Sequence, residues 1–333
     1  MIRRVLMLLC LVLCLPKMAL AAYTSLFVFG DSLSDGGNAY TLSGGAWPDS
    51  PPYAQRFTNG PTAAEVLAAQ LGIADFKPSA LGGTNYAVGG ATTGVGNFNY
   101  ITGSPAGLPA TIASTGMQAQ LASFADNWFD AGMAQPLFDP ARSLFMVWGG
   151  PNDFFLGLGL GANPVDVLTT AVGNIAGIVG TLAGLGAVDI LVPNMPNLAT
   201  TPFGLSQDEL AQSQLGALSA GFNTALAQAL GVVGGLFPWA NIIEFDTAGF
   251  FADLLASPAD FGFTDVITPC FLIGACDGFL FVDGVHPTAQ AHSILGRAFA
   301  QAVPEPATSA LIMLALLGLL ATRRGRVARQ AVS

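Results

Sequence analysis

The chain contains only two histidines, His286 and His292, so any imidazole that acts as a base must belong to one of them. Both lie in the stretch DGVHPTAQAH, where Asp283 precedes His286 by three residues. In a turn, this spacing brings the carboxylate against the imidazole. A carboxylate on one ring nitrogen fixes the tautomer and leaves the other nitrogen free to accept a proton. The sequence therefore predicts an oriented base at His286 and a structural role for His292, which has no nearby acid.

A candidate nucleophile, Ser32, lies near the other end of the chain in the stretch FVFGDSLSDGGN. It follows a short apolar run typical of a β-strand. Segments that leave a parallel strand at its carboxyl end face the crevice where α/β proteins bind ligands. A hydroxyl is a weak nucleophile until a base takes its proton, which is the task predicted for His286. Residues 33–40 are expected to begin a helix whose free N–H groups point toward the crevice, and the alternative role for Ser32 is to cap that helix.

Two further stretches offer hydrogen-bond donors. GGTNYAVGGATT places Gly89 and Gly90 after a predicted strand, where a backbone N–H can approach a ligand without a Cβ in the way. VWGGPNDFF places Asn152 after another predicted strand. Backbone and side-chain amides that converge on one oxygen form an oxyanion hole, which stabilises the charge of a tetrahedral intermediate. Asn152 and one of the two glycines are therefore the candidate donors.

The elements that would position these residues follow an α/β pattern. Short runs rich in Val, Ile, Leu and Phe alternate with longer Ala and Leu stretches, as expected for a mostly parallel sheet covered by helices. The predicted strands are residues 25–29, 85–88, 143–148, 188–192 and 242–245. The predicted helices are residues 62–71, 117–127, 165–185, 208–230 and 288–302, and Ser206 is the expected cap of the fourth. The glycine-rich connection 91–116 has no clear period and is long enough to serve a function.

Taken in order, four blocks of the chain resemble the GDSL esterases and lipases, also called SGNH hydrolases. They are GDSL at residues 30–33, the glycine block around Gly90, GPND at 150–153 and DGVHPT at 283–288. The resemblance spans nearly all of the predicted mature domain. It implies a three-layer, flavodoxin-like sandwich with a mostly parallel central sheet, and a serine ester hydrolase that works through an acyl-serine intermediate.

The same resemblance implies a role for each matching residue. Ser32 is the nucleophile, and His286 is the base oriented by Asp283. The Ser32 amide, Gly90 and Asn152 are the oxyanion donors, with Gly89 as the alternative to Gly90. The substrates compatible with this chemistry are small-molecule, lipid or acetylated-polysaccharide esters, and no metal or organic cofactor is required.

Two other functions compete with this interpretation. An α/β-hydrolase needs Gly-x-Ser-x-Gly at a strand-to-helix turn, but the nearest match, ALSAG at 217–221, lies inside a predicted helix with no strand before it. A non-catalytic extracellular matrix or polysaccharide-binding protein on the same fold is the second alternative. Such a module has no need for a base, an orienting acid and oxyanion donors together, so catalysis is favoured.

Charge excludes one class of partner. All but one of the 21 acidic residues lie between residues 22 and 302, where the basic residues are only Arg56, Lys77, Arg142 and Arg297. A surface with this balance repels phosphate backbones, so nucleic acid is not an expected partner. Neutral esters fit this charge better than anionic ones.

Two cysteines, Cys270 and Cys276, lie outside the predicted signal peptide. An oxidising export compartment favours a disulfide between them over two free thiols. Because no histidine stands nearby at ligand spacing, the pair falls short of a zinc site.

Both ends of the chain carry export patterns. Residues 1–21 show two arginines, an apolar run and small residues, which predict a signal peptide cleaved after Ala21 or Ala22, with a buried N-terminal helix as the alternative. Residues 303–333 contain Pro-Glu-Pro, an apolar stretch at 307–322 and four arginines. This tail resembles the PEP-CTERM sorting signal of Gram-negative bacteria, which implies removal by an exosortase after transient membrane association. A permanent C-terminal anchor is the alternative. The hydrolase domain is then residues 22–302, and the mature protein is expected in the periplasm, at the cell surface or outside the cell.

Overall fold

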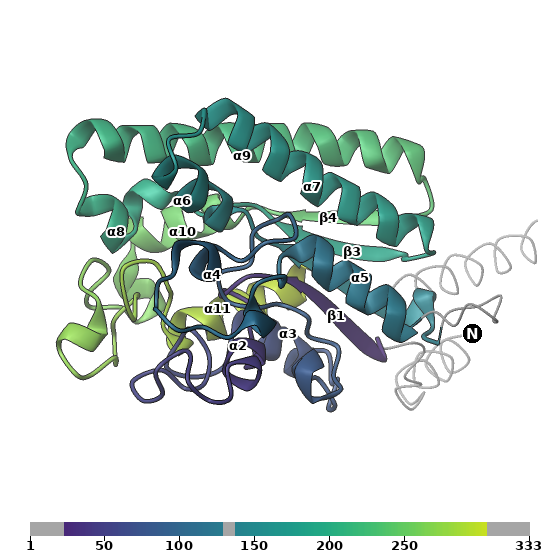
Figure 1. Cartoon of the computed structure of the whole chain (residues 1–333), viewed down its shortest axis with the longest axis horizontal. Coiled ribbons are helices and arrows are strands. Elements are labelled where there is room, and N and C mark those ends of the chain that lie inside the picture. The colour runs from purple at the N-terminus through teal and green to yellow at the C-terminus, as the bar shows by residue number, and fades with distance from the viewer. Residues whose placement is uncertain (1–22, 129–136, 305–333) are drawn as a thin grey trace, which may run out of the picture. The chain divides into compact units, whose positions relative to one another are not determined.

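A parallel sheet of four strands forms the centre of the fold (Figure 1). The computed structural model describes residues 23–128 and 137–304, and residues 24–303 form one folded unit. Neighbouring strands follow the order β1-β2-β3-β4, with bounds Ser25–Gly30, Ser143–Trp148, Asp189–Pro193 and Asn241–Phe245. Gly30 pairs with Trp148, and Pro193 pairs with Phe245, at the carboxyl ends of the strands. The loops that follow the strands therefore start along one edge of the sheet.

The predicted strand at 85–88 runs beside β1 without becoming a full strand. The N–H groups of Tyr86 and Val88 donate to β1 backbone carbonyls, at 2.8 and 3.2 Å. On its outer side, the carbonyls of Asn85 and Ala87 accept hydrogen bonds from the Asn38 side-chain amide at 2.7 and 2.8 Å. A side chain thus satisfies this edge where another strand would otherwise pair. With this segment counted as the second in sequence, the spatial order is 2-1-3-4-5, the flavodoxin-like order.

Helices cover both faces of the sheet and complete the predicted three-layer sandwich (Figure 1). Helices α5 (Met117–Trp128), α7 (Pro164–Gly184) and α9 (Glu209–Leu236) share a core with Phe27 and Phe145 on one face. On the other face, α11 (Ala289–Ala302) packs Phe299 against Trp148, with ring centroids 5.6 Å apart, and α3 (Ala63–Gln70) packs on α11. β1, β2 and β3 are buried on both faces and therefore read as nearly continuous apolar runs, which is why the pattern located them.

The five predicted helices are present, with one difference in capping. Helix α9 begins at Glu209 and ends at Leu236, beyond the expected end at residue 230. Its cap is Asp208, whose side chain accepts the Ala211 N–H at 2.8 Å, so the expectation of a Ser206 cap is wrong. Ser206 instead ends a short helix, α8 (Pro202–Leu205), and donates its hydroxyl to the Phe203 carbonyl.

The expected helix at 33–40 is also absent in that form. Residues 31–35 form a turn, and helix α2 covers only Asn38–Leu42. Its start is set by Asp35, whose carboxylate accepts the N–H groups of Gly37, Asn38 and Ala39. Ser32 therefore does not cap this helix and lies in the turn that precedes it.

Further helices that the sequence did not indicate lie in the connections. They are α4 (Phe98–Thr102), within the long glycine-rich connection, α6 (Pro151–Gly159), directly after β2, and α10 (Thr247–Ala256), after β4. By length and composition α7 and α9 could span a membrane, but both contribute buried residues to the core. The predicted signal peptide and the apolar segment of the tail lie outside the described residues.

Candidate active site

Ser32, His286 and Asp283 form a hydrogen-bonded row. The Ser32 Oγ lies 2.7 Å from Nε2 of His286, and Nδ1 of the same ring lies 2.7 Å from Oδ2 of Asp283. Ser32 comes from the turn after β1, whereas the other two residues come from the loop that leads into α11. The fold thus brings together a hydroxyl, an imidazole and a carboxylate from opposite ends of the chain.

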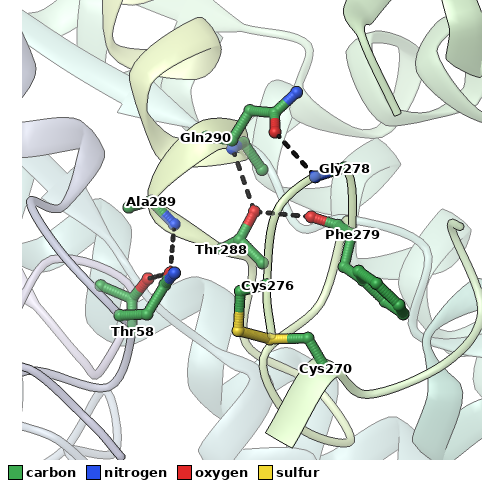
Figure 2. Close-up of a disulfide and its surroundings, with 10 residues drawn as sticks. Thr58, Cys270, Cys276, Gly278, Phe279, Thr288, Ala289 and Gln290 are labelled. Carbon is green, nitrogen blue, oxygen red and sulfur yellow. Dashed lines mark hydrogen bonds between the residues drawn. A yellow bond between two sulfur atoms is a disulfide. The ribbon is translucent and has the colours of Figure 1, made fainter. Parts of the chain in front are cut away.

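The Asp-x-x-His spacing works because the two carboxylate oxygens of Asp283 have separate tasks. Oδ1 accepts the backbone N–H groups of Val285 and His286 at 2.9 and 2.8 Å, which closes the turn. Oδ2 is left to hold the imidazole. The loop then enters α11 through Thr288, which caps the helix and donates its hydroxyl to the Phe279 carbonyl at 2.8 Å (Figure 2).

The pairing of Asp283 with His286 shifts the pKa of each group in the direction opposite to the shift that burial alone would cause. Burial by itself would raise the pKa of Asp283 and lower that of His286, because it disfavours charge. The neighbouring imidazole and the hydrogen bonds from His286, Tyr53 and Val285 instead hold the pKa of Asp283 well below its usual range. Against the opposing effect of its own burial, Asp283, with a smaller contribution from Asp31, raises the pKa of His286. The carboxylate on Nδ1 assigns the tautomer, so Nε2 is the nitrogen that exchanges a proton with Ser32.

The two candidate glycines differ in what their N–H groups do. Gly89 donates to Oδ2 of the buried Asp35 at 2.8 Å, and a Cβ added to it would lie 2.1 Å from the Phe57 ring. Gly90 lines the cleft beside Ser32 and His286. Within the described part of the chain, the N–H groups of Ser32 and Gly90 make no hydrogen bond. Of the two glycines, Gly90 is therefore the one able to donate to a ligand.

Asn152 lies at the start of α6, directly after β2, and its side chain is 8% exposed. The turn before it needs a backbone at φ 126° at Gly150, which glycine adopts without strain. The Asn152 amide donates one hydrogen to the Ala91 carbonyl at 3.0 Å, which ties α6 to the glycine block. A side-chain amide has a second donor, and Asn152 lines the cleft with Gly90 and Ser32.

The cleft in front of these groups has a volume of about 730 Å³, within the range of small-molecule sites. Most of its wall comes from the segments 43–57, 98–109, 151–155 and 196–201, which include α4 and the start of α6, so the glycine-rich connection supplies one side. Its apolar lining includes Trp47, Phe57, Phe98, Leu108 and Phe155. Such a lining suits an acyl chain or an aromatic group.

Three further residues contribute to the site without a clear signal in the sequence. Tyr53 donates its hydroxyl to Oδ2 of Asp283 across 230 positions of sequence. Asp31, next to Ser32, is buried, and burial raises its pKa to about 7. Asp35 is buried as well, which raises its pKa to about 6, although four backbone N–H groups favour its charged form. Asp35 accepts the N–H groups at the start of α2 from two positions before the cap residue Gly37, so it does not stand at the usual capping position.

The structure joins Cys270 and Cys276 in a disulfide, with 4.9 Å between their Cα atoms (Figure 2). Inside the bridged loop, the Cys270 and Phe271 N–H groups donate to the carbonyls of Phe281 and Val282, at 2.9 and 3.2 Å. Those carbonyls belong to the two residues that directly precede Asp283. The disulfide loop is thus attached to the segment that carries the acid.

The remaining sequence candidates have structural positions. His292 is buried, which lowers its pKa to about 3, and its Nδ1 accepts the Ala63 N–H at 3.1 Å. It links α11 to α3, as expected for a structural histidine. Ser219, the serine of the ALSAG stretch, is buried within α9 and donates to the Leu215 carbonyl. It does not lie at a strand-to-helix turn, which argues against the α/β-hydrolase alternative.

Comparison with known proteins gives two matches to family models. The model of GDSL-like lipases and acylhydrolases matches residues 26–299, and the PEP-CTERM protein-sorting motif matches residues 302–326.

Several curated proteins are similar over most of the chain. The anther-specific proline-rich protein APG of Brassica napus is 27% identical over 327 residues, which cover 85% of this chain and 72% of that protein. The phosphatidylcholine-sterol acyltransferase of Aeromonas hydrophila is 29% identical over 251 residues, covering 75% of this chain and 66% of that protein. Esterase EstA of Pseudomonas putida is 29% identical over 318 residues, covering 82% of this chain, and the chain spans only 46% of its length.

Among solved structures, the acetylxylan esterase Axe2 of Geobacillus stearothermophilus aligns with 15% identity and a TM-score of 0.45, covering 86% of this chain and 96% of that one. An aryl esterase of M. smegmatis aligns with 20% identity and a TM-score of 0.42, covering 84% of this chain and 97% of that one.

Proposed function

Because the chain belongs to the family of GDSL-like lipases and acylhydrolases, we propose that it is an exported serine ester hydrolase with Ser32 as the nucleophile. The observation that carries this assignment is the unbroken row from the Ser32 hydroxyl through His286 to Asp283, at the wall of an apolar cleft. A non-catalytic binding protein would need none of these three groups in this order.

Acylation follows from the geometry of the row. The Ser32 Oγ attacks the carbonyl carbon of the ester while its proton passes to Nε2 of His286, 2.7 Å away. The electron pair of the carbonyl double bond moves to oxygen, which accepts hydrogen bonds from the Ser32 N–H, the Gly90 N–H and the Asn152 amide. When the intermediate collapses, the bond to the alcohol oxygen breaks. The alcohol takes the proton from Nε2, and the acyl group remains on Ser32.

Deacylation repeats these steps with water. His286 accepts a proton from the attacking water, the same donors hold the second oxyanion, and the carboxylic acid leaves as Ser32 regains its proton. In both halves a positive imidazolium forms beside Asp283. The ionised carboxylate stabilises this charge and keeps the ring oriented. All proton transfers therefore use this chain's own side chains.

The cleft favours uncharged ester groups. Among the described residues that line it, none is lysine or arginine, and most of the wall is aromatic or aliphatic. This supports neutral carboxylic esters of small molecules, lipids or acetylated polysaccharides as the substrate class. Several relatives and structural neighbours are named as esterases, lipases or acyltransferases.

Export is supported by the C-terminal sorting motif, which directs proteins of Gram-negative bacteria to export. The finer steps are part of the proposal: a signal peptide at residues 1–21, a hydrolase domain at 22–302, and removal of the tail by an exosortase after transient membrane association. The product would reside in the periplasm, at the cell surface or outside the cell. A mature protein whose mass still includes residues 323–329 would rule out removal of the tail.

The test compares the purified protein with Ser32→Ala on nitrophenyl esters of short and long acyl chains. The variant should lose almost all turnover, because it lacks the hydroxyl that faces Nε2 of His286. Ser206→Ala removes a hydroxyl from the surface helix α8 and should keep the wild-type rate. Equal hydrolysis by wild type and Ser32→Ala would discard the mechanism.

A further inference from the structure

The carboxylate of Asp283 makes more hydrogen bonds than a serine–histidine–aspartate row requires. Oδ1 is occupied by the two backbone N–H groups of its own turn. Oδ2 faces Nδ1 of His286 and, in addition, accepts the phenolic O–H of Tyr53. A residue from the first fifth of the chain is thus bonded to the very oxygen that orients the imidazole.

Tyr53 is held in place by two aromatic rings. Its ring lies edge-on to Phe271, with centroids 4.8 Å apart, and tilted against Phe57 at 6.2 Å. Phe57 also approaches the His286 ring, with centroids 5.5 Å apart. Edge-on aromatic pairs add packing energy and fix orientation. The phenol is therefore clamped between the disulfide loop and a ring that contacts the imidazole.

The disulfide loop connects the two sides of this clamp. Phe271, which packs against Tyr53, directly follows Cys270, and its N–H donates to the Val282 carbonyl one residue before Asp283. The disulfide loop therefore packs against Tyr53, the hydrogen-bond donor, and is hydrogen-bonded to the residue that precedes Asp283, the acceptor. Figure 2 shows the disulfide beside the start of α11, where Gly278 N–H donates to the Gln290 side chain at 3.3 Å.

We propose that Tyr53 is a positioning residue of the catalytic row, which acts through Oδ2 of Asp283 to set the orientation and basicity of His286. This inference rests on the proposed function only for its kinetic consequences. A hydrogen bond to a carboxylate favours its charged form and shares its negative charge. With the phenol in place, Asp283 holds the imidazolium proton less tightly than a carboxylate that faces the imidazole alone.

The Tyr53 hydroxyl keeps its proton, and therefore remains a hydrogen-bond donor, over the working pH range. Burial, and then the charge of Asp283, raise the pKa of Tyr53 above its usual value, so it stays a donor. Among the other titratable groups, Asp49 acts on Tyr53, whereas Asp31 in the turn after β1 and His292 in α11 interact with His286. None of them lies between the phenol and the carboxylate, so the hydroxyl can be removed without moving these groups.

The first test is Tyr53→Phe in the whole protein, which removes the hydroxyl and keeps the ring in the cleft wall. We expect kcat to fall roughly 10-fold, the typical effect of losing one hydrogen bond to a charged group, while KM stays unchanged. The acid limb of kcat/KM, which reports the free imidazole, should move to higher pH because Asp283 then holds the proton more tightly. Tyr100→Phe removes a hydroxyl from a surface tyrosine of α4 and should change neither value.

A second measurement does not depend on activity. His292 is buried with a pKa of about 3 and stays neutral, so an NMR titration of the imidazole protons between pH 5 and 9 should follow His286 alone. In Tyr53→Phe its midpoint should rise. Phe271→Leu, which loosens the ring that supports the phenol, should raise it by a smaller amount.

These readouts separate the two proposals. If the wild-type protein hydrolyses no ester but the midpoint rises in Tyr53→Phe, the proposed function fails and the role of Tyr53 stands. A raised KM with unchanged kcat would make Tyr53 a substrate-binding residue only. An unchanged or lowered midpoint in a cooperatively folded variant would overturn the positioning role.

Discussion

Gly90→Ala tests whether the glycine block is an oxyanion donor, because the structure predicts two separate effects of a single methyl group. Gly90 has φ 73°, and a Cβ placed there would lie 2.2 Å from Oδ1 of Asn99 and 2.7 Å from Oδ1 of Asn97. Both distances are far inside van der Waals contact. Neither side chain can retreat freely, because the Asn99 amide donates to the Ser104 carbonyl and the Asn97 amide donates to the Gly89 carbonyl. The backbone at Gly90 must therefore move.

The magnitude follows from these two effects. The left-handed backbone conformation costs an alanine about 1–2 kcal/mol of stability. Displacing one oxyanion donor lowers kcat by roughly 10²–10³, or about 2.7–4 kcal/mol of transition-state stabilisation. We therefore expect a folded protein of reduced stability whose turnover falls by about two orders of magnitude or more.

A matched control lies in the same connection. Gly103 has φ 67°, but an added Cβ would have no heavy atom within 4 Å. Gly103→Ala should thus lose only about 1–2 kcal/mol of stability to the left-handed conformation and keep its turnover. The assay is kcat and KM on a nitrophenyl ester, with the thermal unfolding midpoint of each variant. If Gly90→Ala folds and turns over at the wild-type rate, Gly90 is not a donor.

Two other predictions concern Asp31 and the disulfide. Because burial raises the pKa of Asp31 to about 7, the stability that its neutral form contributes is fully present below about pH 4 and is lost as the pH rises through 7. Asp31→Asn, which stays neutral at every pH, should raise the unfolding midpoint at pH 8 but not at pH 4, and a gain confined to pH 4 would contradict the linkage. The same variant should move the acid limb of kcat/KM to lower pH, since the Asp31 charge helps to raise the pKa of His286. Removing the disulfide with Cys270→Ser and Cys276→Ser opens a loop with a sequence separation of 6, which should cost about 2 kcal/mol and lower kcat by loosening Asp283. An unchanged rate and unfolding midpoint would show that the loop does not support the site.

The chemistry-bearing residues were accessible from the sequence because each depends on its near neighbours. The turn from Asp283 to His286 is closed by hydrogen bonds within three residues, so the spacing, together with the other three blocks, indicated an oriented base. Short apolar runs located the strands, and β1, β2 and β3 tolerate few polar residues because they are buried on both faces. The small number of histidines also helped to identify the candidate base, because only two imidazoles had to be distinguished.

The predictions from sequence were wrong where a side chain forms hydrogen bonds with backbone groups that a strand or helix would otherwise pair. The segment 85–88 has the apolar character of a strand, but the Asn38 side chain occupies its outer carbonyls. The helix expected after Ser32 starts later because Asp35 takes the N–H groups of its first turn. Local propensity is a weak guide at such points, since the choice depends on tertiary contacts.

By itself, the sequence determined the class of fold and identified Ser32, His286 and Asp283 as candidate site residues, because strand pattern and motif spacing are local properties. Only the tertiary structure distinguished the N–H group of Gly89 from that of Gly90. The N–H of Gly89 donates to the carboxylate of Asp35, 54 positions away, and no local sequence pattern indicates such a hydrogen bond. The same holds for Tyr53, whose hydroxyl reaches Asp283 across 230 positions. Which polar groups remain free for a substrate is settled by hydrogen bonds between segments far apart in the chain, and these form only when the whole domain folds.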